Sequence, residues 1–298
     1  MKDLYEIAGY SRQAHWDYMS RIEELEKRKE ALVLAIKSTR ELHPTIGGKK
    51  LYELIGPEFI GRDLFFDFMR GNDLLTERKR SSVKTTDSVR SHSFPNLIPG
   101  LEICGINQLW TSDITYYRIG ETFFYIFFLL DVYSRRILGY HAGSDMRAES
   151  ALIPLKMALE TRGVEDFSFR LIHHTDQGVQ YASKIYTELL EKYHVKISMS
   201  SNVLENSHVE RINGTIKNGY LIPWKPRSLN ELKKFLKKAV ENYHDCPHWS
   251  LDFKTPLQFE RLIQDIPISK RSPLRLASVV DPILYAQLRN QPSLFDQA

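Results

Sequence analysis

The sequence is poor in cysteine, with Cys104 and Cys246 far apart in 298 residues, and it lacks a long hydrophobic run. Two cysteines do not make a disulfide framework or a four-ligand zinc site, and they favour reduced thiols in a cytoplasmic protein. The longest apolar run, 123–130, is far short of the roughly 20 residues that span a membrane, and it is typical of a buried strand. Asp3 and Glu6 stand where a signal peptide would carry its apolar segment. We therefore expect no membrane contact.

A strong excess of one charge is also missing, because 41 basic residues face 37 acidic ones and leave a net charge of +4. This balance does not identify a nucleic-acid binder, so the placement of the charges matters more than their sum. Hydrophobic residues make up 42% and charged residues 26%, as in ordinary globular proteins. The length allows two domains.

Residues 1–75 are expected to form a helical, helix-turn-helix-like DNA-binding region. Gly9 would stop a first short helix and Ser11 would cap the next. Five helices are expected. They cover residues 4–8, a segment that begins after Ser11, residues 27–42, a short segment that ends at Leu54, and residues 62–69. Lys49 and Lys50, at the start of one short helix, are candidate DNA contacts.

Residues 76–105 are predicted to be a basic linker, since the stretch is polar and poor in apolar side chains. Arg78, Lys79 and Arg80 lie in it as candidate contacts to DNA phosphates.

From residue 106 the pattern changes to alternating strands and helices. The expected strands are 109–119, 123–132, 137–142, 170–174 and 195–199, and the expected helices are 147–162, one capped by Ser183, and 206–220. Ile185, Leu189 and Leu190 are expected to face inward, and the last helix is expected to stop before Pro223. The order of elements matches the α/β, ribonuclease-H-like fold, a five-stranded mixed sheet flanked by helices, over 106–222.

Three acids stand where such a sheet would bring them together. Asp113 lies inside the first strand, where a lone carboxylate is unfavourable unless it is solvated or bound. Asp176 directly follows a strand, a common place for functional residues in α/β proteins. Glu210 lies on the last helix, with Glu205 as a rival one turn earlier and Asp131 as another acid at a strand end. Converging carboxylates of this kind bind hard divalent cations.

The last helix carries an apolar stripe beside a polar one. Val209, Ile212 and Ile216 form the apolar stripe. The polar stripe comprises Asn206, Glu210, Asn213 and Lys217, of which the three non-acidic members are candidate DNA contacts. Arg211 begins a stretch to Lys238 that is basic apart from Glu231, which favours a DNA path. Within this stretch, Trp224 is expected to pack rather than stack on a base.

Several segments in this order resemble the integrase-core transposases of the insertion-sequence-three family and, more distantly, retroviral integrases. The resemblance covers about residues 4–262. It is carried by Trp110-Thr111-Ser112-Asp113-Ile114-Thr115-Tyr116, Leu130-Asp131-Val132-Tyr133-Ser134-Arg135-Arg136, His174-Thr175-Asp176-Gln177-Gly178-Val179-Gln180-Tyr181 and Glu205-Asn206-Ser207-His208-Val209-Glu210.

The resemblance implies a DNA transposase that cleaves element ends and transfers strands. Asp113, Asp176 and Glu210 would be its Asp-Asp-Glu triad, both catalytic and metal-binding, with two Mg²⁺ or Mn²⁺ ions as cofactor. His174 would orient Asp176 or a metal-bound water, and a packing role for this histidine is an equal alternative. The partners would be DNA, at least one further copy of the chain and an upstream helix-turn-helix protein, in the cytoplasm at the bacterial nucleoid.

The sequence also departs from the family pattern. Between Asp176 and Glu210 lie 33 residues (210 − 176 − 1), against about 35 in the usual motif, and the difference falls in 201–204. Cys246 replaces an arginine expected after Tyr243. Residues 223–262 are expected to form a basic helix and the end of the core, and 263–298 a tail. A hydrolytic nuclease of the same fold and a domesticated DNA-binding regulator remain alternative functions.

Overall fold

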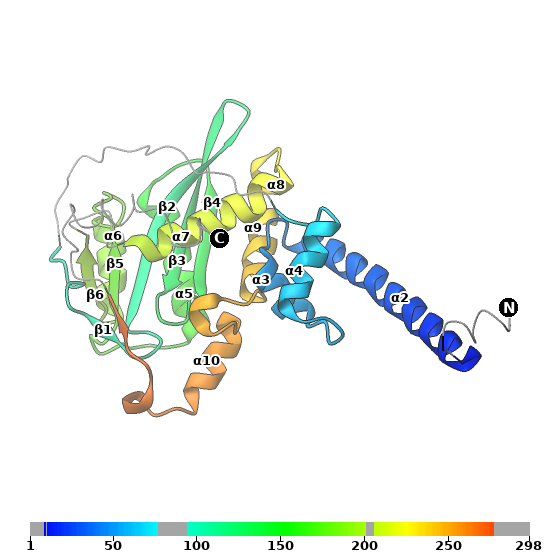
Figure 1. Cartoon of the computed structure of the whole chain (residues 1–298). Helices are drawn as coiled ribbons and strands as arrows, with labels where there is room; N and C mark the ends of the chain where they lie inside the picture. Colours follow the sequence, from blue (N-terminus) through cyan, green and yellow to red (C-terminus); the bar gives the residue numbers. More distant parts are fainter. Residues whose placement is uncertain (1–8, 10, 77–93, 201–205, 277–298) are drawn as a thin grey trace, which may run out of the picture. The chain divides into compact units, whose positions relative to one another are not determined.

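The computed structural model describes residues 9, 11–76, 94–200 and 206–276, which divide into two compact units, Met1–Arg78 and Lys79–Ala298 (Figure 1). The first unit contains α2 (Arg12–Leu42), α3 (Gly48–Ile55) and α4 (Arg62–Gly71). In its core, Phe65 contacts Tyr52 edge to face, with ring centroids 5.3 Å apart. None of the described helices is both long enough and apolar enough to cross a membrane.

The N-terminal helices are partly as predicted. The Ser11 side chain accepts a hydrogen bond from the Ala14 N–H, which confirms the predicted cap. The prediction of a separate helix over 27–42 is wrong, because α2 is continuous from Arg12 to Leu42. Charged residues joined by i,i+4 pairs, such as Glu23 with Lys27, support its polar first half. The expected helix over 4–8 lies outside the described residues.

The second unit is built on a five-stranded mixed sheet in the order β4-β3-β2-β5-β6. Its strands are β2 (Leu109–Ile119), β3 (Thr122–Asp131), β4 (Ile137–Gly143), β5 (Ile172–Thr175) and β6 (Lys196–Met199). The first three form an antiparallel meander, and β5 and β6 run parallel to β2. This is the predicted ribonuclease-H-like arrangement, with β2 in the centre.

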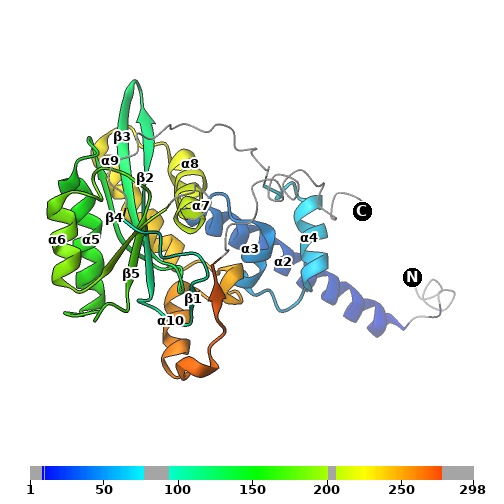
Figure 2. The same cartoon turned by 90° about the vertical axis from the view of Figure 1, so that its left-hand side faces the viewer.

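Helices cover both faces of this sheet (Figure 2). One face packs on α5 (Ala148–Arg162) and α6 (Lys184–Lys192), around Trp110 and Phe127. The other packs on α7 (Ser207–Ile216) and α9 (Leu229–His244), around Tyr117 and Phe128. Alternate side chains of β2 therefore enter different cores, as its sequence predicts. A Cβ at Gly139 would clash with the Pro154 carbonyl oxygen, so glycine permits the close approach of α5 to β4.

Two details of the helices differ from the prediction. Ile185 is exposed, and Tyr186 is buried in its place together with Leu190, because α6 begins at Lys184 and turns Tyr186 toward the sheet. The sequence predicts that the helical segment beginning with α7 stops before Pro223, but it continues past this residue. A π-helical turn, Lys217–Leu221, leads into α8 (Ile222–Trp224), and the Ile222 N–H reaches back five residues to the Lys217 carbonyl.

The folded unit extends beyond the predicted core at both ends. β1 (Glu102–Ile103) lies in the segment assigned to the linker, and it pairs with β7 (Leu274–Arg275) in the segment assigned to the tail. Ile98 and Leu276 are buried in one cluster with Leu109. These apolar side chains pack beside β2 and β5, which is why residues 94–105 are not a free tether. The basic residues Arg78, Lys79 and Arg80 lie outside the described residues.

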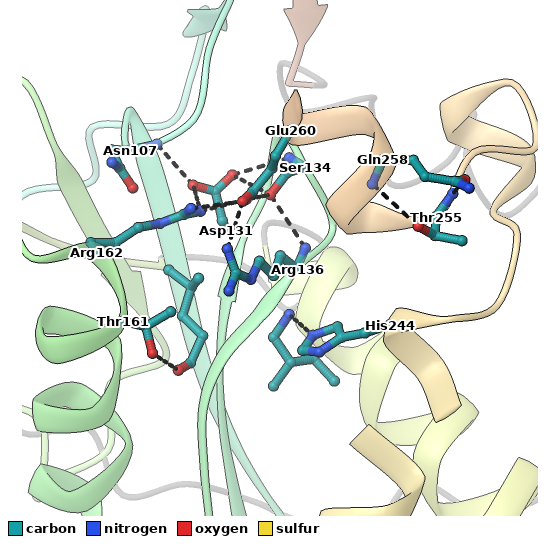
Figure 3. Close-up of polar contacts among 12 residues, drawn as sticks. Asn107, Asp131, Ser134, Arg136, Thr161, Arg162, His244, Thr255, Gln258 and Glu260 are labelled. Atoms are coloured by element: carbon teal, nitrogen blue, oxygen red, sulfur yellow. Dashed lines mark hydrogen bonds and ion pairs between the residues drawn. The ribbon is translucent and has the colours of Figure 1, made fainter. Parts of the chain in front are cut away.

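A buried ionic network joins the sheet to α10 (Pro256–Gln264) (Figure 3). Arg162, at the end of α5, donates to Asp131 at 3.0 Å and to both oxygens of Glu260 at 2.7 and 2.9 Å. Arg136 and Ser134 each donate to Glu260 at 2.7 Å. Burial acts to raise the pKa of Glu260, but its bonds to Arg162 outweigh burial and lower it. Asp131 is therefore a buried structural residue that binds Arg162 and has no contact with solvent.

Candidate active site

Asp113 projects from the central strand toward helix α7. Its register partner in β3 is Phe128, and Asn213 Nδ2 on α7 donates a hydrogen bond to Asp113 Oδ2 at 2.6 Å. Burial raises the pKa of Asp113 to about 8, and the negative charges of Asp176 and Glu210 add to the effect. The strand, the helix and the loop after β5 therefore bring three carboxylates within electrostatic reach of one another.

Asp176 follows the end of β5, next to the strand that carries Asp113. The parallel strands pair Ser112 with Thr175. Asp113 is the next residue on β2 and Asp176 is the first residue after β5, so they lie at the same level of the sheet. The Gly178 N–H donates to Asp176 Oδ1 at 3.1 Å, which fixes the orientation of the carboxylate. Burial raises the pKa of Asp176 as well.

Glu210 lies in the first turn of α7 and remains exposed to solvent. The predicted apolar stripe is confirmed, because Val209, Ile212 and Ile216 are buried against the sheet. Partial desolvation raises the pKa of Glu210. The helix therefore presents its carboxylate at the boundary between the sheet and solvent, while Glu205 lies outside the described residues.

Ser112 ties together the elements that carry the three acids, a role that the sequence analysis missed. Its hydroxyl lies 2.9 Å from His173 Nε2 on β5, and its carbonyl accepts a hydrogen bond of 3.2 Å from Asn206 Nδ2 at the start of α7. Tyr186 on α6 also contacts His173, at 3.3 Å. Burial lowers the pKa of His173 to about 3, so the ring is neutral. A polar residue directly before Asp113 and two adjacent histidines in β5 were the available signals.

The polar side chains of the α7 stripe form contacts with β2 of the same chain. Asn206 and Asn213 are buried and bind β2 through their amide groups, and Lys217 Nζ lies 4.3 Å from the centre of the Tyr116 ring. They hold the helix on the strand, and their contacts to DNA stay a prediction. Arg211 is exposed on the same helix.

The remaining candidates have varied surroundings. His174 is fully buried, with Nδ1 2.8 Å from Ser198 Oγ on β6, so its support of Asp176 stays a prediction. Trp224 packs on Tyr220 and Phe235 at centroid distances of 5.3 and 5.8 Å, as expected for a packing residue. Lys49 and Lys50 lie in the first turn of α3.

The carboxylates fit a divalent cation by their chemistry. Among residues 9, 11–76, 94–200 and 206–276, no three His, Cys, Asp or Glu side chains are grouped closely enough to hold one ion. Asp113, Asp176 and Glu210 nevertheless supply only oxygen donors, which hard cations prefer. Burial and, after it, repulsion by Asp176 and Glu210 raise the pKa of Asp113, and a bound cation would offset both effects.

We expect Asp113→Asn to raise the melting temperature of the protein in EDTA, and to raise it more at pH 8 than at pH 5. The folded pKa of Asp113, about 8, lies above its ordinary value of 3.8, so ionisation costs stability increasingly as pH rises through that window. Asparagine removes the cost. Thermal unfolding at both pH values measures the difference.

Asp145→Asn is the matched control, with the opposite sign. Hydrogen bonds from Arg147 and Ser150 lower the pKa of Asp145, so its ionised form stabilises the fold above its ordinary pKa. This substitution should lower the melting temperature at both pH values. Equal shifts at pH 5 and pH 8 for Asp113→Asn would contradict the raised pKa of Asp113.

Known proteins share sequence similarity with the part of the chain that contains Asp113 and Asp176. Residues 105–202 match the family described as "Integrase core domain". The chain is 31% identical to the transposase of insertion sequence element IS904 from Lactococcus lactis over 176 residues, which are 57% of this chain and 68% of that protein. It is 28% identical to the 31 kDa protein of insertion element IS600 from Shigella sonnei over 256 residues, 81% of this chain and 91% of that protein.

Other relatives match over a shorter stretch. A putative transposase of element IS986/IS6110 from Mycobacterium tuberculosis is 36% identical over 141 residues, 45% of this chain, and the match spans only 50% of that protein. Among solved structures, the HTLV-2 integrase catalytic core has a TM-score of 0.41 at 20% identity, covering 55% of this chain and 99% of that one. A chain of the simian T-cell lymphotropic virus intasome, solved in complex with the PP2A regulatory subunit B56 gamma, has a TM-score of 0.47 at 19% identity, covering 77% of this chain and 76% of that one.

Proposed function

Because this chain belongs to the insertion-sequence transposases that carry an integrase core domain, we propose that it cleaves the ends of a mobile DNA element and joins them to a second DNA. The observation that carries the proposal is that the charges of Asp176 and Glu210 both act on the buried Asp113 carboxylate of the central strand. These residues are proposed as the Asp-Asp-Glu triad.

Two divalent cations, Mg²⁺ or Mn²⁺, are the proposed cofactor, held by Asp113, Asp176 and Glu210. When bound, such ions neutralise charge at the phosphodiester and align the reacting oxygens. The chain's own residues prepare the carboxylates for this role. Asn213 fixes the Asp113 carboxylate, the Gly178 N–H fixes that of Asp176, and Asn206 holds the helix of Glu210 on β2.

Two displacements at phosphorus make up the proposed reaction. In the first, the oxygen of water bonds to phosphorus, and the 3′ oxygen of the element's end leaves and takes up a proton. In the second, that 3′ hydroxyl bonds to phosphorus in the target strand, loses its proton, and displaces the target's own 3′ oxygen. No cofactor is consumed, so catalysis rests on alignment and on electrostatic stabilisation.

DNA and further copies of the chain are the proposed partners. Lys49, Lys50, Arg211 and Lys217 are proposed contacts to phosphates, and so are Asn206 and Asn213 once DNA is bound. Joining two element ends requires at least a dimer. An upstream helix-turn-helix protein is a further proposed partner, in the cytoplasm at the nucleoid.

The test uses labelled duplexes from the DNA that flanks the coding sequence, a supercoiled plasmid as target, and buffer with or without Mg²⁺. We expect joined products that depend on the metal. Cutting without joining would instead favour a hydrolytic nuclease. Tight binding with no reaction in the presence of the upstream partner would favour a DNA-binding regulator and overturn the proposal.

A further inference from the structure

Arg135 has an unusual backbone in the turn between β3 and β4. Its φ of 60° lies in the left-handed region, which a residue other than glycine adopts at a cost. Its carbonyl oxygen accepts a hydrogen bond of 2.9 Å from the Tyr243 hydroxyl on α9. The surrounding structure thus holds this arginine in one place.

The Arg135 side chain is half-buried beside the start of α7. Its Nη1 lies 2.7 Å from His208 Nδ1. A guanidinium only donates hydrogen bonds, so His208 Nδ1 accepts this one and the ring is neutral. The guanidinium is therefore oriented by an uncharged group.

Arg135 differs from its neighbours in making no ion pair with any described carboxylate. Arg136 and Arg162 both form ion pairs with Glu260. Within the described part of the chain, neither Arg135 nor Arg211 makes an ion pair with a carboxylate. Burial lowers the pKa of Arg135 and the charge of Arg211 lowers it further, which outweighs the opposing effects of Tyr243 and of the more distant Asp131.

A desolvated cation without a counter-ion is unfavourable, and a second cation nearby makes it more so. An anion placed between Arg135 and Arg211 would remove both costs. Arginine binds phosphate oxygens in pairs through its planar fork of N–H groups. His208 and Arg211 lie one turn apart on α7, the helix that also carries Glu210, so such an anion would bind at a helix of the proposed active site.

We propose that Arg135 and Arg211 together bind one backbone phosphate of DNA next to Glu210, with His208 as the residue that positions the Arg135 guanidinium. This inference rests on the proposed function, because it names a binding site for the same substrate. The rival anion is Glu205 of the chain itself, which lies outside the described residues.

The test is equilibrium binding of a short labelled duplex in EDTA over a range of salt concentrations, so that catalysis plays no part. Arg135→Gln and Arg211→Gln should each weaken binding. Each should also reduce the slope of log K against log salt, and the double variant should reduce it by about 0.9, the value for one lost phosphate contact. Arg135→Lys keeps the charge, so it should keep the slope while losing affinity.

Lys156→Gln is the matched control, because Lys156 is exposed on α5, on the opposite face of the sheet. Its slope should equal that of the unmodified chain. If Arg135→Gln does not fold, the exposed Arg211 carries the test alone.

An unmodified chain that binds DNA, with folded Arg135→Gln and Arg211→Gln variants that keep its slope, would overturn the phosphate site and leave the proposed function intact. Glu205 would be the true counter-ion if Glu205→Gln lowered the melting temperature while the two arginine variants kept their slopes. An unmodified chain that binds no duplex would overturn both proposals.

Discussion

Replacing Asp113, Asp176 or Glu210 by its amide should lower the rate of strand joining by about a thousandfold or more. Asparagine and glutamine keep the shape of the side chain and remove the negative charge that would hold a divalent cation. The effect should appear in both cleavage and joining, because one set of acids serves both steps. Gel assays with labelled ends and a plasmid target measure each step.

Glu205→Gln is the control for this first prediction. Glu205 lies five residues before Glu210 and is the other candidate for the third acid of the triad. We expect Glu205→Gln to retain joining while Glu210→Gln loses it. DNA binding in EDTA should persist in all three triad variants, since the substitutions remove charges that repel phosphate. The reverse result for the two glutamates would move the catalytic role to Glu205.

Arg162→Met should destabilise the second unit by about 3–5 kcal/mol, the usual cost of leaving buried charges without their partner. Arg162 donates to Asp131 and Glu260, whose exposed fractions are 0% and 5%, so its loss leaves Asp131 without a cation and Glu260 with Arg136 as its remaining cation. α10 would then lose its polar anchor to the end of α5. Urea unfolding followed by tryptophan fluorescence measures the change in the free energy of unfolding.

Arg147→Met provides the comparison for the buried network. Arg147 also forms a short ion pair, 2.8 Å from Asp145, but its side chain is 76% exposed. Solvent screens such pairs, so the change in stability should be small. A similar loss in both variants would mean that the Arg162 network is no more important than a surface contact. Arg162→Lys, which keeps one charge and loses the fork, should fall between the two.

The sheet and the faces of its elements could be predicted from local patterns. Residues 109–119 alternate in character and Gly120 follows them directly, so the bounds of β2 could be predicted from the sequence. The stripe of Val209, Ile212 and Ile216 likewise fixed the inner face of α7. Both signals lie within a few residues of the feature that they predict.

Features that depend on distant residues could not be predicted in this way. Asp131 looked like one more acid at a strand end, and its role depends on Arg162 and Glu260, far along the chain. The position of Asn213 on a polar stripe was evident, but its bond to Asp113 requires the sheet and helix to meet. The site residues themselves stay predictions, since their chemistry awaits the experiments above.

The short ladder between β1 and β7 can open independently of the rest of the second unit. Only Glu102 with Arg275 and Ile103 with Leu274 are paired in this ladder, and the Leu276 N–H adds one bond of 3.2 Å to the Leu101 carbonyl. So few hydrogen bonds can open while the five-stranded sheet stays intact, because local opening costs less than global unfolding. A pull applied at Leu276 would therefore detach this strand and expose Ile103 long before it disturbed the strand of Asp113.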